Sequence, residues 1–334
     1  MSKEYGMGLK KSKPDSRDYS AVRLLQVAEE ILPDVTHNQA FCSKIYSQGR
    51  TGFCWAYTGT ALINYLLKRF FFPNANFELS PLYLAQFVKK YCAEYPEQEG
   101  ESIRAMMKGL QKGGITPESL YNPTYQVGSL VFEAPSEKAI SIALKHIIGA
   151  YARLTTIREI QSSLAKGIPV PVGIFCCSSI FTDHVLDMPS GDWAGGHGIL
   201  LIDYNKNLIM KGRKGWFLFQ NSWIDEDGTL WGDGGFGWIS FDYLEYIDES
   251  AGGMPYMIDA FGVAGIAKLP LYDEIEMVPN KYTAVMDGTT YNLDQPPAVD
   301  PVTYRTLAPV RALAEMLSMS VDWDQTSQKI TLKR

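Results

Sequence analysis

The sequence predicts an α+β protein with a helical first half, a β-rich second half and a small C-terminal domain of strand pairs around a helix. Apolar residues recur at helical spacing directly after Cys54, and no proline interrupts them before Pro73. Beyond Ala150, short apolar runs bounded by glycine or proline indicate buried strands. After residue 280, turn-separated strand patterns lie on both sides of a helical pattern.

The helical half is expected to run from Cys54 to about Gly114, and the strands follow Ala150. A short amphipathic helix that ends before Pro33 is expected to pack against the outside of the fold. The predicted elements are a helix over residues 21–32, helices Pro81–Cys92 and Ser102–Gln111, and strands Pro169–Phe175, Gly198–Asp203 and Gly215–Gln220.

The composition is that of an ordinary globular chain of 334 residues, with 46% hydrophobic residues and a formal net charge of −6. The mild acidity argues against nucleic acid as a principal partner, and no run reaches the roughly 18 apolar residues of a membrane span. Residues 1–20 contain no apolar signal-peptide core. As written, the chain is expected to be cytoplasmic, with release or cell-surface association as the alternative.

Cys54 opens the helical pattern in the run QGRTGFCWA, which begins at Gln48. A thiol at a helix N-terminus is activated, because the unpaired N–H groups and the helix dipole lower its pKa. A buried apolar cysteine is the other interpretation of the same pattern. The cysteine alone does not decide between them.

Two later blocks contain the partners that a nucleophilic thiol needs, a base and a group that orients the base. His197 lies in the run WAGGHGILLID, directly before apolar residues that indicate a buried strand. Asn221 ends a second such strand in WFLFQNSW, and WGDGGFGWI follows as a glycine-rich turn with another strand. The order cysteine, histidine, asparagine predicts a thiol nucleophile with a histidine base.

In these blocks the chain resembles the papain family of cysteine peptidases, in its bacterial form. The resemblance rests on the QG…CWA, GHG and NSW…WG…GF blocks and runs from about Asp15 to about Gly265. Cys54 and His197 also have the separation of roughly 130–150 residues typical of papain-type enzymes. The resemblance implies a papain-like two-lobed fold, with the active site between a helical lobe and a β-rich lobe.

The family's catalytic roles carry over to four residues of this chain. The resemblance implies that Cys54 attacks the scissile carbonyl, and that His197 forms an ion pair with it and later protonates the leaving amine. Asn221 orients the His197 ring, and Gln48 with the Cys54 N–H forms the oxyanion hole. Trp223 shields the Asn221–His197 hydrogen bond from water. We expect no metal or other cofactor.

Substrate contacts follow from the same resemblance. Small residues at Gly173 and Gly198 leave the pocket for the P2 side chain roomy, so we expect it to tolerate a bulky apolar or aromatic residue. The expected substrate contacts are Gly100, Gly173, Gly196, Gly198 and Trp223.

Several residues depart from the family pattern. Phe53 stands where a small residue usually precedes the nucleophile, so we expect it to narrow the cleft. Thr51 replaces a cysteine that forms a disulfide in many members. Cys42 and Cys92 could form a disulfide with each other, or both could be free thiols.

Two acidic stretches each allow two interpretations. Glu97, Glu99 and Glu101 around Gly100 suit either a preference for basic substrates or, more commonly, a solvated loop. The added loop 224–230 contains three consecutive acidic residues, which suit either a cation site or, more commonly, a solvated turn.

The chain after residue 280 is similar to the small domain named after the N-terminal domain of copper amine oxidases. The similarity rests on a helical stretch, Arg305–Leu317, and a strand pair over 321–332, which follow a hairpin of residues 281–286 and 289–293. Because residues 281–334 contain no histidine or cysteine, we expect no copper site. Binding of a cell-surface or protein partner and stabilisation of the catalytic domain are both open as its role. The expected domains are an N-terminal extension (1–38), a peptidase domain (39–265), a linker (266–280) and this C-terminal domain (281–334).

The predicted function is a cysteine endopeptidase that hydrolyses peptide or protein substrates through a thioester acyl-enzyme. A transpeptidase, isopeptidase or peptidoglycan-peptide hydrolase with the same triad is one alternative, because each shares the acyl-enzyme. A catalytically silent binding protein is the other. Only 47 residues precede Gln48, too few for the family's usual pro-segment, so we expect no standard zymogen activation.

Overall fold

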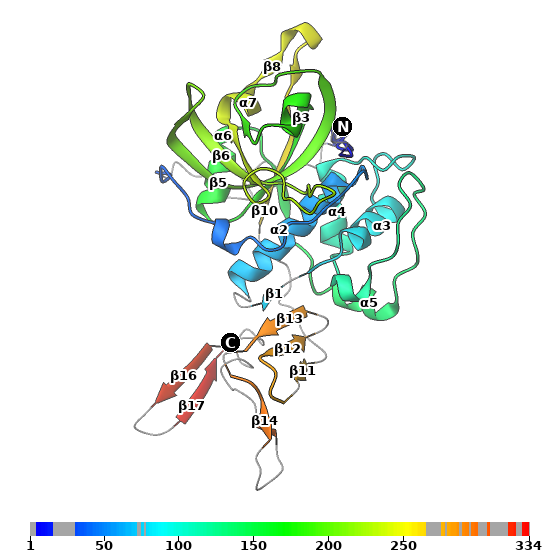
Figure 1. Ribbon diagram of the computed structural model, residues 1–334, viewed down its shortest axis with the longest axis vertical. Coiled ribbons are helices and arrows are strands. Elements are labelled where there is room, and N and C mark those ends of the chain that lie inside the picture. The colour runs from blue at the N-terminus through cyan, green and yellow to red at the C-terminus, as the bar shows by residue number, and fades with distance from the viewer. Residues whose placement is uncertain are drawn as a thin grey trace.

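The computed structural model contains a helical lobe and a β-rich lobe side by side, with a tail that extends from the helical lobe (Figure 1). This is the predicted α+β class. The structure describes residues 5–15, 31–71, 75–76, 78–264, 275–277, 279–286, 289–293, 295–299, 306–307, 320–324 and 329–333.

Helix α2 (Cys54–Phe70) forms the centre of the helical lobe. It is buried on nearly all sides along its first fourteen residues, as its apolar and small side chains require. Helices α3 (Pro81–Tyr91) and α4 (Ile103–Lys112), both predicted, follow Ser80 and Ser102, whose hydroxyl oxygens each accept an N–H from the first turn. The lobe also contains α5 (Glu137–Ala143) and the short 3-10 helices η1 (Gln39–Phe41) and η2 (Glu118–Leu120).

The β-rich lobe is built on a seven-stranded sheet. Its strands are β2 (Tyr151–Arg153), β3 (Val170–Cys177), β4 (Val185–Leu186), β5 (Trp193–Met210), β6 (Arg213–Gln220), β7 (Phe236–Ser240) and β10 (Met257–Val263). They lie in the order β2-β10-β3-β5-β6-β7-β4, antiparallel except for the β4–β7 pair. The three predicted strands are confirmed as parts of β3, β5 and β6, except that β3 begins at Val170, one residue after the predicted start. The lobe also contains α6 (Ile157–Ala165), α7 (Phe241–Glu245), η3 (Ser178–Phe181), η4 (Glu249–Ala251), β8 (Ile247–Asp248) and β9 (Met254–Pro255).

The tail joins the helical lobe through a four-stranded sheet. Its strands are β1 (Ala75–Asn76), β11 (Ile275–Met277), β12 (Thr283–Met286) and β13 (Thr289–Asn292), in the order β1-β13-β12-β11. Strand β1 comes from the loop between α2 and α3, so the helical lobe contributes one edge of the sheet (Figure 1). Ala284, Tyr291 and Leu293 are buried in the same apolar core as α2.

The tail confirms part of the predicted pattern. The hairpin is present as β12–β13, and β16 (Ser320–Asp324) pairs with β17 (Lys329–Lys333) as expected. The stretch predicted as a linker, residues 266–280, contains β11, which at three residues is too short to produce a sequence pattern. The short strands β14 (Ala298–Val299) and β15 (Thr306–Leu307) also pair, β15 at the start of the predicted helix. The rest of that helix, and the one over residues 21–30, lie outside the described residues.

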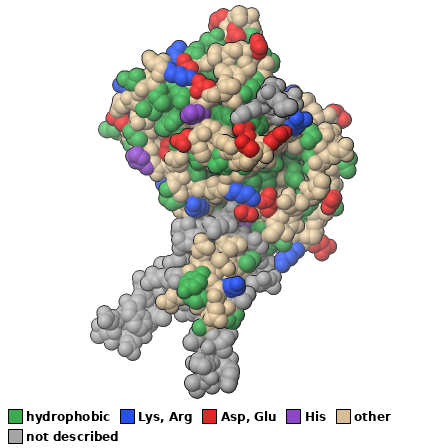
Figure 2. Space-filling model, in the orientation of Figure 1, with side chains coloured by type: hydrophobic (Ala, Val, Ile, Leu, Met, Phe, Trp, Pro, Cys, Tyr) green, Lys and Arg blue, Asp and Glu red, His purple; other side chains and the backbone are tan. Residues whose placement is uncertain are grey.

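On the face shown in Figure 2, acidic and basic side chains are interspersed over the two lobes. None of the helices among the described residues is long and apolar enough to span a bilayer.

Candidate active site

Cys54 is the first residue of α2, and its side chain is fully buried. Phe53 at the N-cap provides no side-chain hydrogen bond, so no cap satisfies the first N–H groups of the helix. The backbone of Gly198, next to His197 on β5, lies against Cys54 and hydrogen-bonds to its thiol. The two lobes therefore bring the segments of the predicted nucleophile and base into contact.

His197 is fully buried on β5, opposite Ile174 of β3. Its Nε2 lies 2.8 Å from Asn221 Oδ1, which also accepts the Ser222 N–H at 2.8 Å. Because Oδ1 is an acceptor, Nε2 carries the hydrogen, and the neutral ring has its lone pair on Nδ1. Nδ1 is buried and has no hydrogen-bond partner among the described residues. It is the ring nitrogen available to a thiol.

Trp223 is fully buried and stacks on the His197 ring, with the centroids 4.4 Å apart and the planes at 28°. Phe181 and Trp231 pack against it at centroid distances of 5.7 and 5.8 Å. These rings keep water away from the His197–Asn221 hydrogen bond, which strengthens it. Trp223 thus has the geometry that the predicted shielding requires.

The side-chain amide of Gln48 is fixed at both ends. Its Oε1 accepts the Ser222 hydroxyl at 2.7 Å, and its Nε2 donates to the carbonyl oxygens of Thr51 at 3.0 Å and Gly6 at 2.8 Å. A donor held in place in advance is what an oxyanion hole needs. Here that donor is engaged by the protein's own main chain.

The N-terminal segment, Tyr5–Asp15, lies across this site. The Leu9 N–H donates to the Gly196 carbonyl oxygen at 3.0 Å, and the Glu101 N–H donates to that of Gly8 at 2.9 Å. Leu9 and Glu101 form a parallel bridge, and Gly8 also hydrogen-bonds through its backbone to the Cys54 thiol. The segment is therefore bound as a short strand between the two lobes, above the nucleophile.

Tyr5, the first described residue of the N-terminal segment, packs over Trp223. Its ring stacks on Trp223 with the centroids 4.5 Å apart and the planes at 5°, and its hydroxyl donates to Asp225. The acidic loop predicted as a cation site or a solvated turn thus holds Tyr5 through Asp225. No cluster of metal-ligating side chains occurs in the part of the chain that the structure describes.

Two glycines allow the segment to lie this deep. A Cβ on Gly6 would overlap the Thr51 carbonyl oxygen, and a Cβ on Gly8 would overlap that of Gly52. Because any side chain would collide with backbone, only glycine fits at either position.

Leu9 is only 3% exposed, and its side chain lies beside Gly173, where the sequence predicts the P2 pocket. Its side chain lies against Gly173, where a Cβ would overlap it, and beside Ile258. Gly196 binds the Leu9 backbone, and a Cβ on Gly100 would overlap the Gly8 carbonyl oxygen. Of the predicted substrate contacts, Gly100, Gly173, Gly196 and Trp223 therefore lie against the N-terminal segment, and the space beside Gly173 fits a branched aliphatic side chain. Gly198 instead faces α2, where a Cβ would meet Thr58 and Cys54.

The sequence did not predict this segment, because the helix over 21–32 is expected outside the fold and the 47 residues before Gln48 are too few for the family's usual pro-segment. A short strand is enough, since main-chain hydrogen bonds hold most of it. The only signal was the alternating glycines of YGMGL.

Burial sets the charge state of the covered site. It raises the pKa of the Cys54 thiol by more than the hydrogen bonds from backbone groups lower it. It also lowers the pKa of His197 to about 4, despite the opposite effect of the hydrogen bond to Asn221. The closed site therefore holds a neutral thiol and a neutral imidazole at neutral pH.

Phe53 does not narrow the cleft, contrary to expectation. Its ring is fully buried in the helical lobe, with centroids 5.9 Å from Trp55, 5.0 Å from Tyr125 and 5.9 Å from Phe132. Tyr125 and Phe132, distant in sequence, give the large side chain a place in the core.

Two of the three acidic residues near Gly100 are structural. Glu101 is buried and pairs with Lys89 at 3.2 Å. Glu99 accepts the Gly52 N–H at 2.6 Å, so it braces the loop before the nucleophile, while Glu97 is exposed. The structure also settles the open choice at Cys42 and Cys92, since both are free thiols.

Comparison with known families gives two matches. The copper amine oxidase N-terminal domain matches residues 273–334. These residues contain no histidine or cysteine, so their donor set does not fit copper. The papain family of cysteine proteases matches residues 32–247.

Individual proteins of this kind are also similar to the chain. Peptidase 1 of Psoroptes ovis is 26% identical over 209 residues, which cover 60% of this chain and 58% of the relative. Cathepsin K of Mus musculus is 24% identical over 234 residues, which cover 67% of this chain and 64% of the relative. The chain thus spans less than two thirds of these curated relatives. The fold matches that of xylellain, a cysteine protease from Xylella fastidiosa, with a TM-score of 0.60 and 21% identity over 80% of this chain and 98% of that one. The chain belongs to the papain family of cysteine proteases.

Proposed function

We propose that this protein is a cysteine endopeptidase in which Cys54 is the nucleophile. The observation that carries the proposal is the state of His197. Its Nε2 is bound to Asn221, its Nδ1 is buried without a partner among the described residues, and the next residue along β5 contacts Cys54. A ring fixed in this way is suited to take the proton of a thiol.

The chemistry follows from these groups. In the open site the Cys54 thiol gives its proton to His197 Nδ1. The thiolate then attacks the scissile carbonyl carbon, and the carbonyl oxygen becomes an oxyanion that accepts hydrogen bonds from Gln48 Nε2 and the Cys54 N–H. Cleavage of the C–N bond follows, with the proton returned from His197 to the leaving amine, and leaves a thioester. Water, deprotonated by His197, then hydrolyses the thioester and restores the thiol.

The conformation described above is the closed form of this peptidase. The Gly6 carbonyl oxygen accepts the hydrogen bond of Gln48 Nε2, and Leu9 fills the P2 pocket. Burial keeps Cys54 and His197 uncharged. Displacement of the N-terminal segment admits both substrate and water. Hydration then favours the charged thiolate and imidazolium.

The test uses a variant that opens the cleft and leaves the triad intact. Leu9→Asp places a carboxylate in an apolar pocket, which disfavours docking of the segment, whereas Leu9→Ile preserves it. In the Leu9→Asp chain we expect hydrolysis of a peptide substrate and one adduct with a papain-directed epoxide by intact mass, both lost on adding Cys54→Ala. Transfer to an added amine in place of hydrolysis would indicate a transpeptidase. A folded, opened chain that shows neither adduct nor cleavage would indicate a binding protein.

A further inference from the structure

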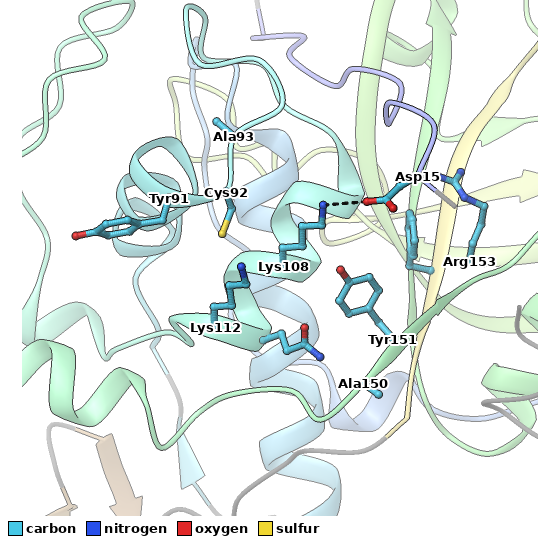
Figure 3. A pocket seen from close by; sticks show the side chains of 11 residues that line it. Asp15, Tyr91, Cys92, Ala93, Lys108, Lys112, Ala150, Tyr151 and Arg153 are labelled. Atoms are coloured by element: carbon cyan, nitrogen blue, oxygen red, sulfur yellow. Dashed lines mark ion pairs between the residues drawn. The ribbon is translucent and has the colours of Figure 1, made fainter. Parts of the chain in front are cut away.

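A cavity of about 410 Å³ lies apart from the Cys54 site, between the C-terminal ends of α3 and α4 and the strands β2 and β10 (Figure 3). Its volume is in the range of small-molecule sites. None of the residues proposed for peptide hydrolysis lines it.

Among the described residues that line the cavity, three of the four charged side chains are cations. Lys108 and Lys112 come from the end of α4 and Arg153 from β2, whereas Asp15 is the one carboxylate among the described residues of the lining. Lys108 Nζ lies 3.5 Å from Asp15 Oδ2 (Figure 3), and Arg153 pairs with the buried Asp259. No carboxylate pairs with Lys112 in the part of the chain that the structure describes.

The carboxylate in the cavity belongs to the N-terminal segment that covers Cys54. Between the two sites, Ser12 donates its N–H at 2.8 Å and its hydroxyl to Asp259, the same residue that holds Arg153. Docking of the segment over the cleft and placement of Asp15 beside Lys108 are therefore parts of one arrangement.

We propose that this cavity binds a compact multivalent oxyanion, of the phosphate or carboxylate class, and that the anion weakens docking of the N-terminal segment over Cys54. The regulatory half rests on the proposed function. An anion in the cavity shares Lys108 with the Asp15 carboxylate, and the two like charges repel. The anion therefore binds more tightly once Asp15 has left. By linkage, its binding favours the undocked segment by the same factor.

A purely structural role explains only some of the charged residues that line the cavity. Cations in the last turn of a helix stabilise it through the helix dipole, which explains Lys112 by itself. It does not explain why Arg153 from another element lines the same space, or why Lys108 meets a carboxylate of the segment that closes the cleft.

The probe is pyrophosphate, added to the full chain with sodium chloride of equal ionic strength as the reference. Iodoacetamide reports on two thiols in the same sample: Cys54 beneath the segment, and Cys92 in the cavity, whose sulfur is turned toward Lys112 (Figure 3). Peptide mapping gives both rates. At saturation we expect Cys54 to react roughly 5- to 150-fold faster, the usual range of coupling between sites. We also expect Cys92 to react more slowly. Burial raises the pKa of this thiol, and the charges of Lys112 and Lys108 partly offset that effect. A bound anion would cancel the offset and leave less of the reactive thiolate.

Variants assign the effect to the cavity. Lys112→Ala should abolish both responses, and Lys214→Ala, at an exposed lysine on β6, should preserve them. Asp15→Asn should accelerate Cys54 alkylation without pyrophosphate and leave little further response. A parallel titration with citrate separates the phosphate from the carboxylate class.

Protection of Cys92 without acceleration at Cys54 would overturn the regulatory half of the proposal, and no response at either thiol would overturn all of it. The alkylation rates of Cys54 and Cys92 can be measured whether or not the protein cleaves peptides. A chain that responds at both cysteines, yet cleaves no peptide, would refute the proposed function and leave this inference standing.

Discussion

The carbonyl oxygen of Gly6 lies 2.8 Å from Gln48 Nε2, the donor that we assign to the oxyanion of a substrate. Under the proposed function, this main-chain carbonyl occupies the place of a reacting carbonyl. Substrate must compete with an internal ligand, so the docking strength of the N-terminal segment governs how much of the peptidase is available.

Gly8→Val should release the segment, because its side chain would overlap the Gly52 carbonyl oxygen. Overpacking of this kind costs about 1–3 kcal/mol, equivalent to roughly a 5- to 160-fold larger open fraction. We expect alkylation of Cys54 to accelerate by that factor in peptide-mapping kinetics. Met7→Leu, a volume-conserving change in the same segment, is the control. Equal Cys54 rates in the two variants would show that residues 5–9 do not limit access.

Gln48→Ala should shift two measurements in opposite directions. Loss of the bond to Gly6 loosens the segment, so alkylation of Cys54 should become faster. Loss of the oxyanion donor should lower kcat for peptide hydrolysis by about 10²–10³ in the Leu9→Asp background. If both rates changed in the same direction, Gln48 would be a structural residue only.

The pH dependence of stability should report the buried His197. Its pKa falls from 6.5 to about 4 in the folded chain, so between these values the unfolded chain binds the additional proton and stability decreases as pH falls. The loss between pH 7 and pH 5 is on the order of 2 kcal/mol. Urea unfolding of the wild type and of His197→Gln at both pH values measures it, since the variant lacks this contribution. Parallel pH profiles would mean that His197 titrates normally.

Removal of a buried side chain from the tail should destabilise the helical lobe. Leu293 is 6% exposed in the core that contains α2, so Leu293→Ala should cost about 2–4 kcal/mol. Tyr282→Ala, at a side chain that is 62% exposed, should change stability by less than about 0.5 kcal/mol. A single unfolding transition that shifts only in the first variant would indicate one cooperative unit. Two separate transitions would favour an independent module.

The pocket around Leu9 predicts the choice of substrate. In the opened Leu9→Asp chain, peptides with leucine at P2 should exceed those with alanine in kcat/KM by at least about tenfold. Gly173→Val should remove that preference, because its side chain occupies the space that Leu9 fills. A preference for alanine in the unmodified pocket would exclude this assignment.

The sequence located the helices α3 and α4, the central strands and the hairpin of the tail, because each has a local pattern. Gln48, Cys54, His197 and Asn221 could be assigned because each lies in a short run of residues that resembles a papain-family motif. Tyr5–Leu9 could not, since main-chain hydrogen bonds to distant loops leave no periodicity in the residues that make them.

Phe53 illustrates a second limit. Its size suggested a narrower cleft, but its orientation depends on Tyr125 and Phe132, and no local pattern connects these residues. Strand β1 illustrates a third, because two residues between helices become an edge strand only when β13 is present.

The pairing of β1 with β13 has a mechanical consequence. Tension on the last residues of the chain would enter the helical lobe at the loop after Phe70, whereas Cys54 stands at the opposite end of the same 17-residue helix, about 25 Å away. A pull on the tail would therefore load the β1–β13 pairing and the core contacts of Ala284, Tyr291 and Leu293 before it reached the nucleophile.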